Sequence, residues 1–411
     1  MTTSRLYKKT LLAVAVSSLT LASTQATAAG FQLNSQSATG LGRAFAGDAV
    51  IADNASVMAR NAAAMTLFDS HQFSGGVNYI DTDIKIKEFG GPVGTGIPDT
   101  TNSSGTPVPN IYYLHRLNDR WALGAGIYSN FGTKNNFDAN FAEGGPAGGA
   151  AANFGGTTEI TSVNYTLNAA YRINDQWSVG GGLDIVQGSG KLQRPAAPNS
   201  NIYAVDIDAS GIGLGFNLGT VFELNEQPLR FSVSLQPEIK ADGDIKLAGG
   251  LVDYSNEKLL LPLPSMVEFS GFHKIQDTKF AVHYSLQWIG WSTFESLKTD
   301  AGNIDSQYQW KDGYHVAVGG TYYLNDAWTL RAGYMYDTAA QDQITSISVP
   351  DSDRQWFSAG FGYNFKQHHT IDFGFTYLMG ADVSVTEGDG LLTATTRADA
   401  ILAGLQYSYS F

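Results

Sequence analysis

The chain has 411 residues, including 46 glycines, 20 tyrosines and 22 phenylalanines, and only 15% of its residues are charged. The absence of cysteine excludes a disulfide framework, a thiolate nucleophile and a zinc–cysteine site. The formal net charge of −13 argues against nucleic acid as a partner.

The first 28 residues have the composition of a secretory signal peptide. A positive region, an apolar stretch too short to span a bilayer and a small-x-small sequence follow one another: Arg5, Lys8 and Lys9, then 11–22, then Ala26-Thr27-Ala28. We therefore predict a signal peptide over 1–28, with cleavage before Ala29. No apolar run of about twenty residues follows, so we expect export without a helical anchor.

Residues 29–70 are rich in Ala, Gly, Ser and Asn and lack strand alternation. From Asp53 to Leu67 the sequence is typical of a short helix capped by Asp53 or Asn54. We interpret 29–70 as a partly helical hatch that plugs the lumen of a barrel, because small residues pack closely in a crowded bore. A flexible periplasmic leader is the alternative.

From residue 71 to 411 the dominant pattern is period-two alternation in segments of about ten residues. In one segment the apolar face is formed by Trp121, Leu123, Ala125 and Ile127. Aromatic residues at the strand ends are typical of the interfacial girdles of a lipid-facing band, whereas a soluble sandwich needs only the alternation. The pattern predicts an all-β, transmembrane antiparallel β-barrel.

Short turns divide this region at intervals of roughly fifty residues. Three are near copies, and three are shorter relatives: Leu117-Asn118-Asp119-Arg120-Trp121, Ile173-Asn174-Asp175-Gln176-Trp177 and Leu324-Asn325-Asp326-Ala327-Trp328, then Leu224-Asn225-Glu226, Ile275-Gln276-Asp277 and Phe365-Lys366-Gln367. Each interval accommodates two strands and one longer loop, as in outer-membrane barrels. Six hairpins with a first and a last strand predict about 14 strands and two periplasmic termini.

The chain ends on an alternating aromatic strand that finishes at Phe411. Such an ending resembles the signal read by the barrel-assembly machinery, which we expect as a partner during biogenesis. Outer-membrane lipid and lipopolysaccharide are the expected surroundings, because a closed sheet leaves no unpaired edge for lipid to satisfy.

Several segments, in order along the chain, resemble the FadL-type long-chain fatty acid transporters of the Gram-negative outer membrane. They are Ala29-Gly30-Phe31-Gln32-Leu33-Asn34, Gly40-Leu41-Gly42-Arg43-Ala44-Phe45, Ile51-Ala52-Asp53-Asn54-Ala55, Val108-Pro109-Asn110, Ser129-Asn130-Phe131-Gly132, Leu261-Pro262-Leu263-Pro264-Ser265-Met266, His283-Tyr284-Ser285-Leu286, Trp310-Lys311-Asp312 and 348–354. The resemblance covers essentially the whole mature chain. One departure is Asn61-Ala62-Ala63 where the family commonly has Asn-Pro-Ala, which removes a rigid turn from the hatch.

The resemblance implies a monomeric, fourteen-stranded barrel with a hatch and no continuous water channel. A ligand would be captured by an outer groove, move to a tighter inner pocket and leave sideways at a kinked third strand. In this sequence that kink falls at Asn130 and Gly132. Sideways exit suits an acyl chain, since each methylene gains roughly 0.8 kcal/mol on leaving water.

The resemblance also assigns ligand-contacting residues. Arg194 and Lys311 would meet the ligand carboxylate, although solvated loop charges are the commoner fate of Arg and Lys. Phe31 and Asn61 are assigned to the hatch and pocket, and Phe31 could equally be an ordinary buried aromatic residue. An outer groove is assigned to Phe137, Phe141 and Phe154, with a disordered surface loop as the alternative.

Enzymatic chemistry is not expected. No Gly-x-Ser-x-Gly sequence is present, the seven histidines lack metal-ligand spacing, and no cofactor motif is found. A general porin is one rival and predicts an open, conducting bore. A carrier of aromatic or other hydrophobic hydrocarbons is another, which the cations Arg194 and Lys311 disfavour.

Overall fold

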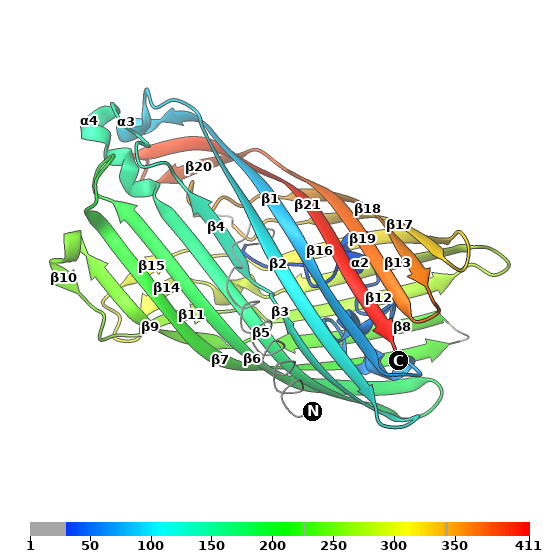
Figure 1. The fold of residues 1–411 in the computed structure, drawn as a ribbon. Helices are drawn as coiled ribbons and strands as arrows, with labels where there is room; N and C mark the ends of the chain where they lie inside the picture. Colours follow the sequence, from blue (N-terminus) through cyan, green and yellow to red (C-terminus); the bar gives the residue numbers. More distant parts are fainter. Residues whose placement is uncertain (1–29, 225–226, 342–343) are drawn as a thin grey trace, which may run out of the picture.

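The computed structural model describes residues 30–224, 227–341 and 344–411. The predicted signal peptide, 1–28, lies outside the described residues. The described chain forms a closed antiparallel β-barrel (Figure 1). None of the helices in these ranges is long and apolar enough to cross a membrane.

The barrel closes because its last strand pairs with its first, with Phe73 opposite Tyr409 and Tyr79 opposite Ala403. Around the described barrel there are fourteen strand positions, since β3 and β4 share one. In order, they are β1 (Gln72–Gly90), β2 (Thr100–Arg116), β3 (Trp121–Tyr128) with β4 (Gly132–Asn136), β5 (Thr157–Arg172), β6 (Trp177–Pro195), β7 (Tyr203–Leu224), β8 (Gln227–Leu235), β12 (Met266–Lys274), β13 (Phe280–Ile289), β16 (Gly313–Tyr323), β17 (Trp328–Asp337), β18 (Arg354–Phe365), β19 (His369–Gly380) and β21 (Leu392–Ser410). The predicted fold class is confirmed.

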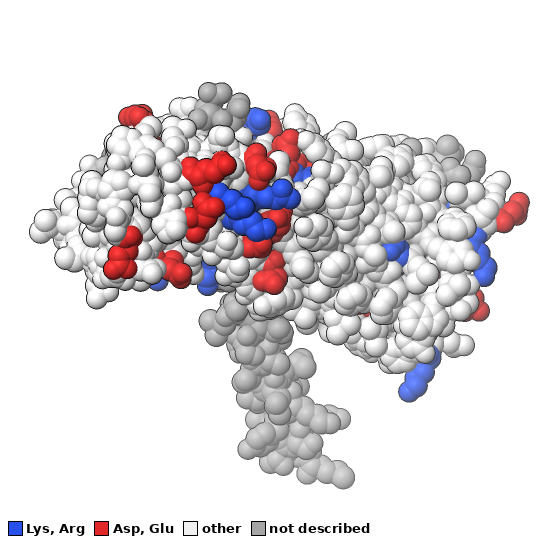
Figure 2. Space-filling model, turned by 90° about the horizontal axis from the view of Figure 1, so that it is seen from above, with Lys and Arg blue, Asp and Glu red and all other residues white. Residues whose placement is uncertain are grey.

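The alternation separates an apolar outer wall from a more polar lining. On β13, Val282 and Leu286 are exposed on the outside, while His283 and Ser285 are buried inside. Figure 2 shows a mostly uncharged face on which charged side chains gather in one patch. On the outward upper part of β1 and β21, Lys85 pairs with Asp83 and Asp399.

Both the start of β1 and the C-terminus lie at the end of the barrel that carries the short turns (Figure 1). In three of these turns the side-chain oxygen of an asparagine accepts hydrogen bonds from the backbone N–H groups two and three residues ahead. These asparagines are Asn118, Asn174 and Asn325. This is the local bond that makes asparagine favourable in a turn. Residues 225–226 of the fourth predicted turn lie outside the described ranges.

The opposite end carries the long loops, which contain their own short elements. A small sheet extends the barrel wall there and includes β9 (Glu238–Leu247), β10 (Val252–Asp253), β11 (Leu259–Pro262), β14 (Ser296–Thr299) and β15 (Asp305–Gln307). Strand β20 (Val383–Glu387) pairs with the top of β21. Short helices at this end are α3 (Gly91–Gly94), α4 (Pro146–Gly149), η3 (Ala150–Phe154), η4 (Ala248–Gly250) and η5 (Trp291–Thr293).

Residues 30–70, called the hatch below, lie within the barrel and contact the inner faces of strands on opposite sides. Its helices are α2 (Ala38–Leu41), η1 (Ala55–Ala59) and η2 (Ala62–Leu67). The single helix expected from Asp53 to Leu67 is wrong. Asn61 has an extended backbone and its side chain caps a new helix at the Ala63 N–H, which divides the segment in two. Asn54 caps the first part, as predicted.

Candidate ligand-binding site

An aromatic cluster surrounds Phe31 at the start of the described chain. The Phe31 ring centroid lies 4.5 Å from that of Trp291 and 5.6 Å from that of Trp310. The rings of Phe294 and Phe131 lie 5.4 and 6.2 Å away. These residues come from the hatch, the β3–β4 connection and two long-loop segments, so the cluster joins parts of the chain that are far apart in sequence.

A cavity of about 40 Å³ lies beside this cluster. Its lining is predominantly apolar and includes Phe31, Ile160, Ile207, Leu259, Leu261, Phe294, Leu297, Trp310 and Val349, with Thr158 and Tyr308 among its polar members and Glu159 and Lys191 as its charged ones. This space is mostly apolar, which suits a hydrophobic ligand more than an ion or a sugar. It is much smaller than the roughly 300–1,000 Å³ of a typical ligand pocket, so a ligand enters only if lining side chains move. We call it the apolar pocket.

Arg194, at the long-loop end of β6, lies against the edge of the apolar pocket. Its Nη2 donates to the Thr158 hydroxyl at 2.9 Å and to the Ser348 hydroxyl at 2.7 Å. Its Nη1 donates to the carbonyls of Gly155 and Thr157, at 2.8 and 3.1 Å. These acceptors are all neutral, so no direct ion pair with a described carboxylate cancels the guanidinium charge.

Glu387, at the end of β20, is the carboxyl group whose charge acts on Arg194. Burial raises the pKa of Glu387 to about 7, against the opposing effects of the Ile347 N–H and of Arg194. The Ile347 N–H donates to its Oε1 at 2.6 Å. Arg194 therefore faces a carboxyl group whose charge changes near neutral pH.

Lys311 is placed differently from Arg194. Its side chain is exposed, and its backbone N–H donates to the carbonyl of Ala340 at 2.8 Å. The preceding residue, Trp310, is buried and lines the apolar pocket. The Trp-Lys-Asp sequence therefore lies at the pocket, but its tryptophan, and not its lysine, is part of the pocket lining.

Asn61 lies in the hatch, away from the apolar pocket. Besides capping η2, its Nδ2 donates to the carbonyls of Ala49 and Thr220, at 3.2 and 3.0 Å. Thr220 lies on β7 near a short turn. Asn61 therefore ties the hatch to the barrel wall and does not belong to the pocket lining.

Asn130 lies where the third strand position is interrupted, and Gly132 is the first residue of β4. The hatch is hydrogen-bonded to this interruption. Leu33 N–H donates to the Asn130 carbonyl at 2.6 Å, and Gly132 N–H donates to the Phe31 carbonyl at 2.8 Å. On the other side, the β2–β3 ladder ends at Ile111 opposite Ile127, so the upper part of β2 pairs with β1 alone.

The phenylalanines assigned to an outer groove gather under the long loops. The Phe137 and Phe141 ring centroids lie 4.6 Å apart, and Phe89 lies 5.7 Å from Phe141. Phe154 packs at the edge of the same cluster. Phe137 and Phe141 are buried, so in this structure they form a packed apolar core and not an open groove.

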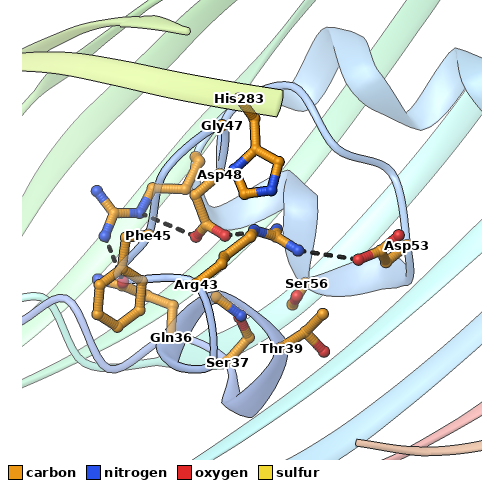
Figure 3. Close-up of polar contacts among 12 residues, drawn as sticks. Gln36, Ser37, Thr39, Arg43, Phe45, Gly47, Asp48, Asp53, Ser56 and His283 are labelled. Atoms are coloured by element: carbon orange, nitrogen blue, oxygen red, sulfur yellow. Dashed lines mark hydrogen bonds and ion pairs between the residues drawn. The ribbon is translucent and has the colours of Figure 1, made fainter. Parts of the chain in front are cut away.

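Ion pairs inside the bore hold the hatch together, as Figure 3 shows for Arg43 with Asp48 and Asp53, and further pairs join the hatch to the wall. Arg43 bridges Asp48 at 2.8 Å and Asp53 at 2.9 Å. Asp53 also pairs with Arg331 of β17 at 3.2 Å, and Arg331 pairs with Asp372 of β19 at 2.9 Å. Burial would raise the pKa of Asp53, but Arg331 and Arg43 lower it below its usual value, so this carboxylate stays charged.

The residues that sequence reasoning missed are Phe294, Tyr308 and Thr158 of the pocket lining and Trp291 of the aromatic cluster beside it. They lie in loops or on an inward strand face, where no motif distinguishes them. Among the described residues, no group of three or more histidines, aspartates and glutamates is placed to hold a metal ion. What the site can do chemically is bind an apolar body beside the Arg194 guanidinium, with Lys191 and Glu159 also in the lining.

Comparisons with known proteins agree over nearly the whole chain. Residues 19–411 match the model of the family described as "Outer membrane protein transport protein (OMPP1/FadL/TodX)". The long-chain fatty acid transport protein of Escherichia coli strain K12 is 34% identical over 459 residues, which covers 99% of each chain. Outer membrane protein P1 of Haemophilus influenzae is 33% identical over 472 residues, covering 98% of this chain and 99% of its own.

Solved structures share the fold. A FadL homologue from Pseudomonas aeruginosa has a TM-score of 0.80 and 24% identity, covering 93% of this chain and 100% of its own. The toluene transporter TodX of Pseudomonas putida has a TM-score of 0.68 and 18% identity, covering 94% of this chain and 100% of its own.

Proposed function

Because this chain belongs to the outer membrane protein transport family, in which proteins carry hydrophobic molecules across the outer membrane of Gram-negative bacteria, we propose that its ligand is a long-chain fatty acid. Relatives with about a third of their residues identical are named for that ligand. The observation that carries the proposal is a guanidinium group, Arg194, at the edge of a mostly apolar pocket whose lining also includes Glu159 and Lys191.

The pocket has an apolar part that suits an acyl chain and a cation that suits a carboxylate. The acyl chain would replace water by apolar side chains such as Leu261 and Trp310, with roughly 0.8 kcal/mol gained for each buried methylene. Its carboxylate would accept hydrogen bonds from Arg194, whose two terminal nitrogens now bond neutral oxygens. An uncharged ligand would leave the guanidinium with its present neutral acceptors and no counter-charge.

The proposed route begins at the long loops, passes through the apolar pocket and leaves sideways at the interruption between β3 and β4. Two contacts of Phe31 support a link between these last steps. Its ring lies in the pocket, and its carbonyl accepts the Gly132 N–H at the interruption. Displacing Phe31 would therefore disturb both places together.

Oleate binding and uptake test this assignment. Arg194→Ala should weaken oleate binding roughly ten- to a hundredfold, since a hydrogen bond to a charged group contributes about 1.5–3 kcal/mol. Lys311→Ala should change binding little, because that side chain is exposed. Binding is measured on the purified protein, and uptake on intact cells that express wild type, each single variant or both together.

Lys246→Ala is the matched control, because Lys246 is an exposed cation at the long-loop end that pairs with Asp244. It should bind oleate like the wild type. Unchanged oleate binding by the Arg194→Ala, Lys311→Ala double variant would remove both residues from the site while leaving the barrel untouched.

A second test uses pH. Above pH 7 the Glu387 carboxylate is charged and offsets the charge of Arg194, whereas below pH 7 it is neutral. Oleate affinity should therefore rise several-fold as pH falls from 8 to 6. Glu387→Gln should remove this rise, which separates it from the titration of oleate itself. An equally steep rise in the Glu387→Gln variant would contradict the role of Glu387.

A carrier of aromatic hydrocarbons is the second candidate, favoured by the shared fold with a toluene transporter. It predicts that Arg194→Ala leaves toluene uptake unchanged and that oleate does not compete. A general porin is disfavoured by the hatch, which lies within the bore. We also propose a monomer, assembled by the barrel-assembly machinery and surrounded by lipopolysaccharide.

A further inference from the structure

An apolar groove runs along the outside of the barrel next to the point where the β2–β3 ladder ends. It has a volume of about 550 Å³. Its outer lining consists of lipid-facing side chains, including Leu167, Leu183, Ile185 and Leu214. It also reaches inward-facing residues of β2, β3 and β5, namely Asn110, Tyr112, Gly126 and Thr166. The groove thus connects the wall's outer surface with its inner face.

Two asparagines lie on that inner face. Asn110 is the first residue of β2 beyond the ladder, and Asn164 on β5 stands opposite Tyr128, the last residue of β3. They are 5% and 0% exposed. Neither the oxygen nor the nitrogen of either side-chain amide has a hydrogen-bond partner within the described chain. Buried amides of this kind are unfavourable unless something else completes their hydrogen bonds.

Several polar groups around these amides are engaged, although the Asn168 Nδ2 and the Asn217 Oδ1 have no partner within the described chain. The Tyr112 hydroxyl donates to the Gln36 carbonyl of the hatch at 2.9 Å. Asn217 on β7 donates both to Asn168 and to the Asp184 carboxylate, at 3.0 and 3.2 Å. The two amides without partners therefore lie on a part of the barrel wall that also carries the acidic side chain of Asp184.

We infer that Asn110 and Asn164 form a polar subsite at the inner mouth of the lateral opening, which binds the uncharged head of the ligand, a protonated carboxyl group. An amide both donates and accepts, as a carboxylic acid does. Asp184 disfavours a second negative charge nearby. The hydrocarbon beyond the opening excludes an ionised carboxylate as well.

This inference rests on the proposed function and adds a step to it. Ile160, four residues along β5 from Asn164, lines the apolar pocket. Between the apolar pocket and the two amides, the hatch is hydrogen-bonded to the β3–β4 interruption through Leu33 and Asn130. The carboxylate would be released by Arg194, take up a proton from water and then be held by the amides as the neutral acid while the tail enters the lipid.

The test compares uptake of two probes with similar tails, oleic acid and 1-octadecene, which lacks the acid. In cells expressing the Asn110→Leu, Asn164→Leu double variant, the oleic acid uptake rate should fall at least tenfold. The 1-octadecene rate should stay within twofold of the wild type. Oleate binding to the purified variant should also stay within twofold, because Arg194 and the apolar pocket are unchanged.

Val186→Leu is the matched control, since Val186 stands opposite Asn164 on β6 and changes size without changing polarity. It should leave the ratio of the two uptake rates unchanged. If the leucine variant does not assemble, the Asn110→Asp, Asn164→Asp variant keeps the volume, adds negative charge and should lower oleic acid uptake selectively.

Equal loss of both probes, or unchanged oleic acid uptake, would overturn the subsite. Failure of the proposed function gives a different result, because the wild-type protein itself would then neither bind nor take up oleic acid. A wild type that carries 1-octadecene as fast as oleic acid and binds no oleate would overturn the subsite together with the fatty acid assignment.

Discussion

Replacing Gly374 by leucine is expected to leave the barrel assembled with its hatch unseated, so that the protein conducts ions. Gly374 lies on the inner face of β19, directly against α2 of the hatch. A Cβ atom there would lie 2.2 Å from the Ala38 carbonyl oxygen and 2.7 Å from the Gly42 nitrogen. Both are backbone atoms, so the clash can be relieved only by moving the hatch. Single-channel recording in planar bilayers should show at least a tenfold higher conductance than the wild type.

Gly320→Leu is the matched control, because a Cβ atom at Gly320 of β16 has its nearest neighbour, the Ala281 carbonyl oxygen, at an ordinary 3.6 Å. It should remain closed. Heat-modifiable electrophoretic mobility reports whether each variant forms a barrel. An assembled Gly374→Leu barrel that stays as closed as the wild type would show that the seating of α2 does not seal the lumen.

The second large effect is expected from Arg331→Met, which removes the cation between the hatch and the wall. The Asp53 and Asp372 carboxylates would lose their shared partner inside the bore. Breaking a buried ion pair costs about 3–5 kcal/mol, which corresponds to a change of about two to three and a half orders of magnitude in the equilibrium between a seated and a released hatch. We expect frequent channel openings and faster proteolysis of the hatch in the assembled barrel.

A rescue separates charge from packing in this case. Asp53 keeps its ion pair with Arg43, so combining Arg331→Met with Asp372→Asn removes the charge that lost its cation and should restore much of the closed time. If the double variant opens as often as Arg331→Met alone, the loss is one of packing and the ion network does not hold the hatch.

Local features of the barrel could be read from the sequence because they depend on neighbours along the chain. Asn118, Asn174 and Asn325 each bond the backbone two and three residues ahead, and this bond is set by the turn alone. Strand alternation is similarly local, since successive side chains of a strand point to opposite faces. Closure by β1 and β21 followed from the even number of strands that short turns implied.

The site was less accessible to the same reasoning. Trp310 and Lys311 are adjacent, and only the path of the loop decides that the tryptophan enters the pocket. Phe137 and Phe141 were assigned to an open groove, yet they pack against each other and against Phe89. Asn61 was placed with the pocket, but its amide reaches β7. In each case the partner comes from another part of the chain.

The sequence by itself determined that this chain is an exported, lipid-facing barrel of about fourteen strands, because residue-by-residue alternation and turn chemistry act over only a few positions. The tertiary structure alone decided which inward residues meet. The Arg43, Asp53, Arg331 and Asp372 chain joins residues more than 300 positions apart, and the two amides at the lateral opening become neighbours only when β2, β3 and β5 are aligned. Such contacts depend on barrel closure and hatch seating, which no local pattern encodes.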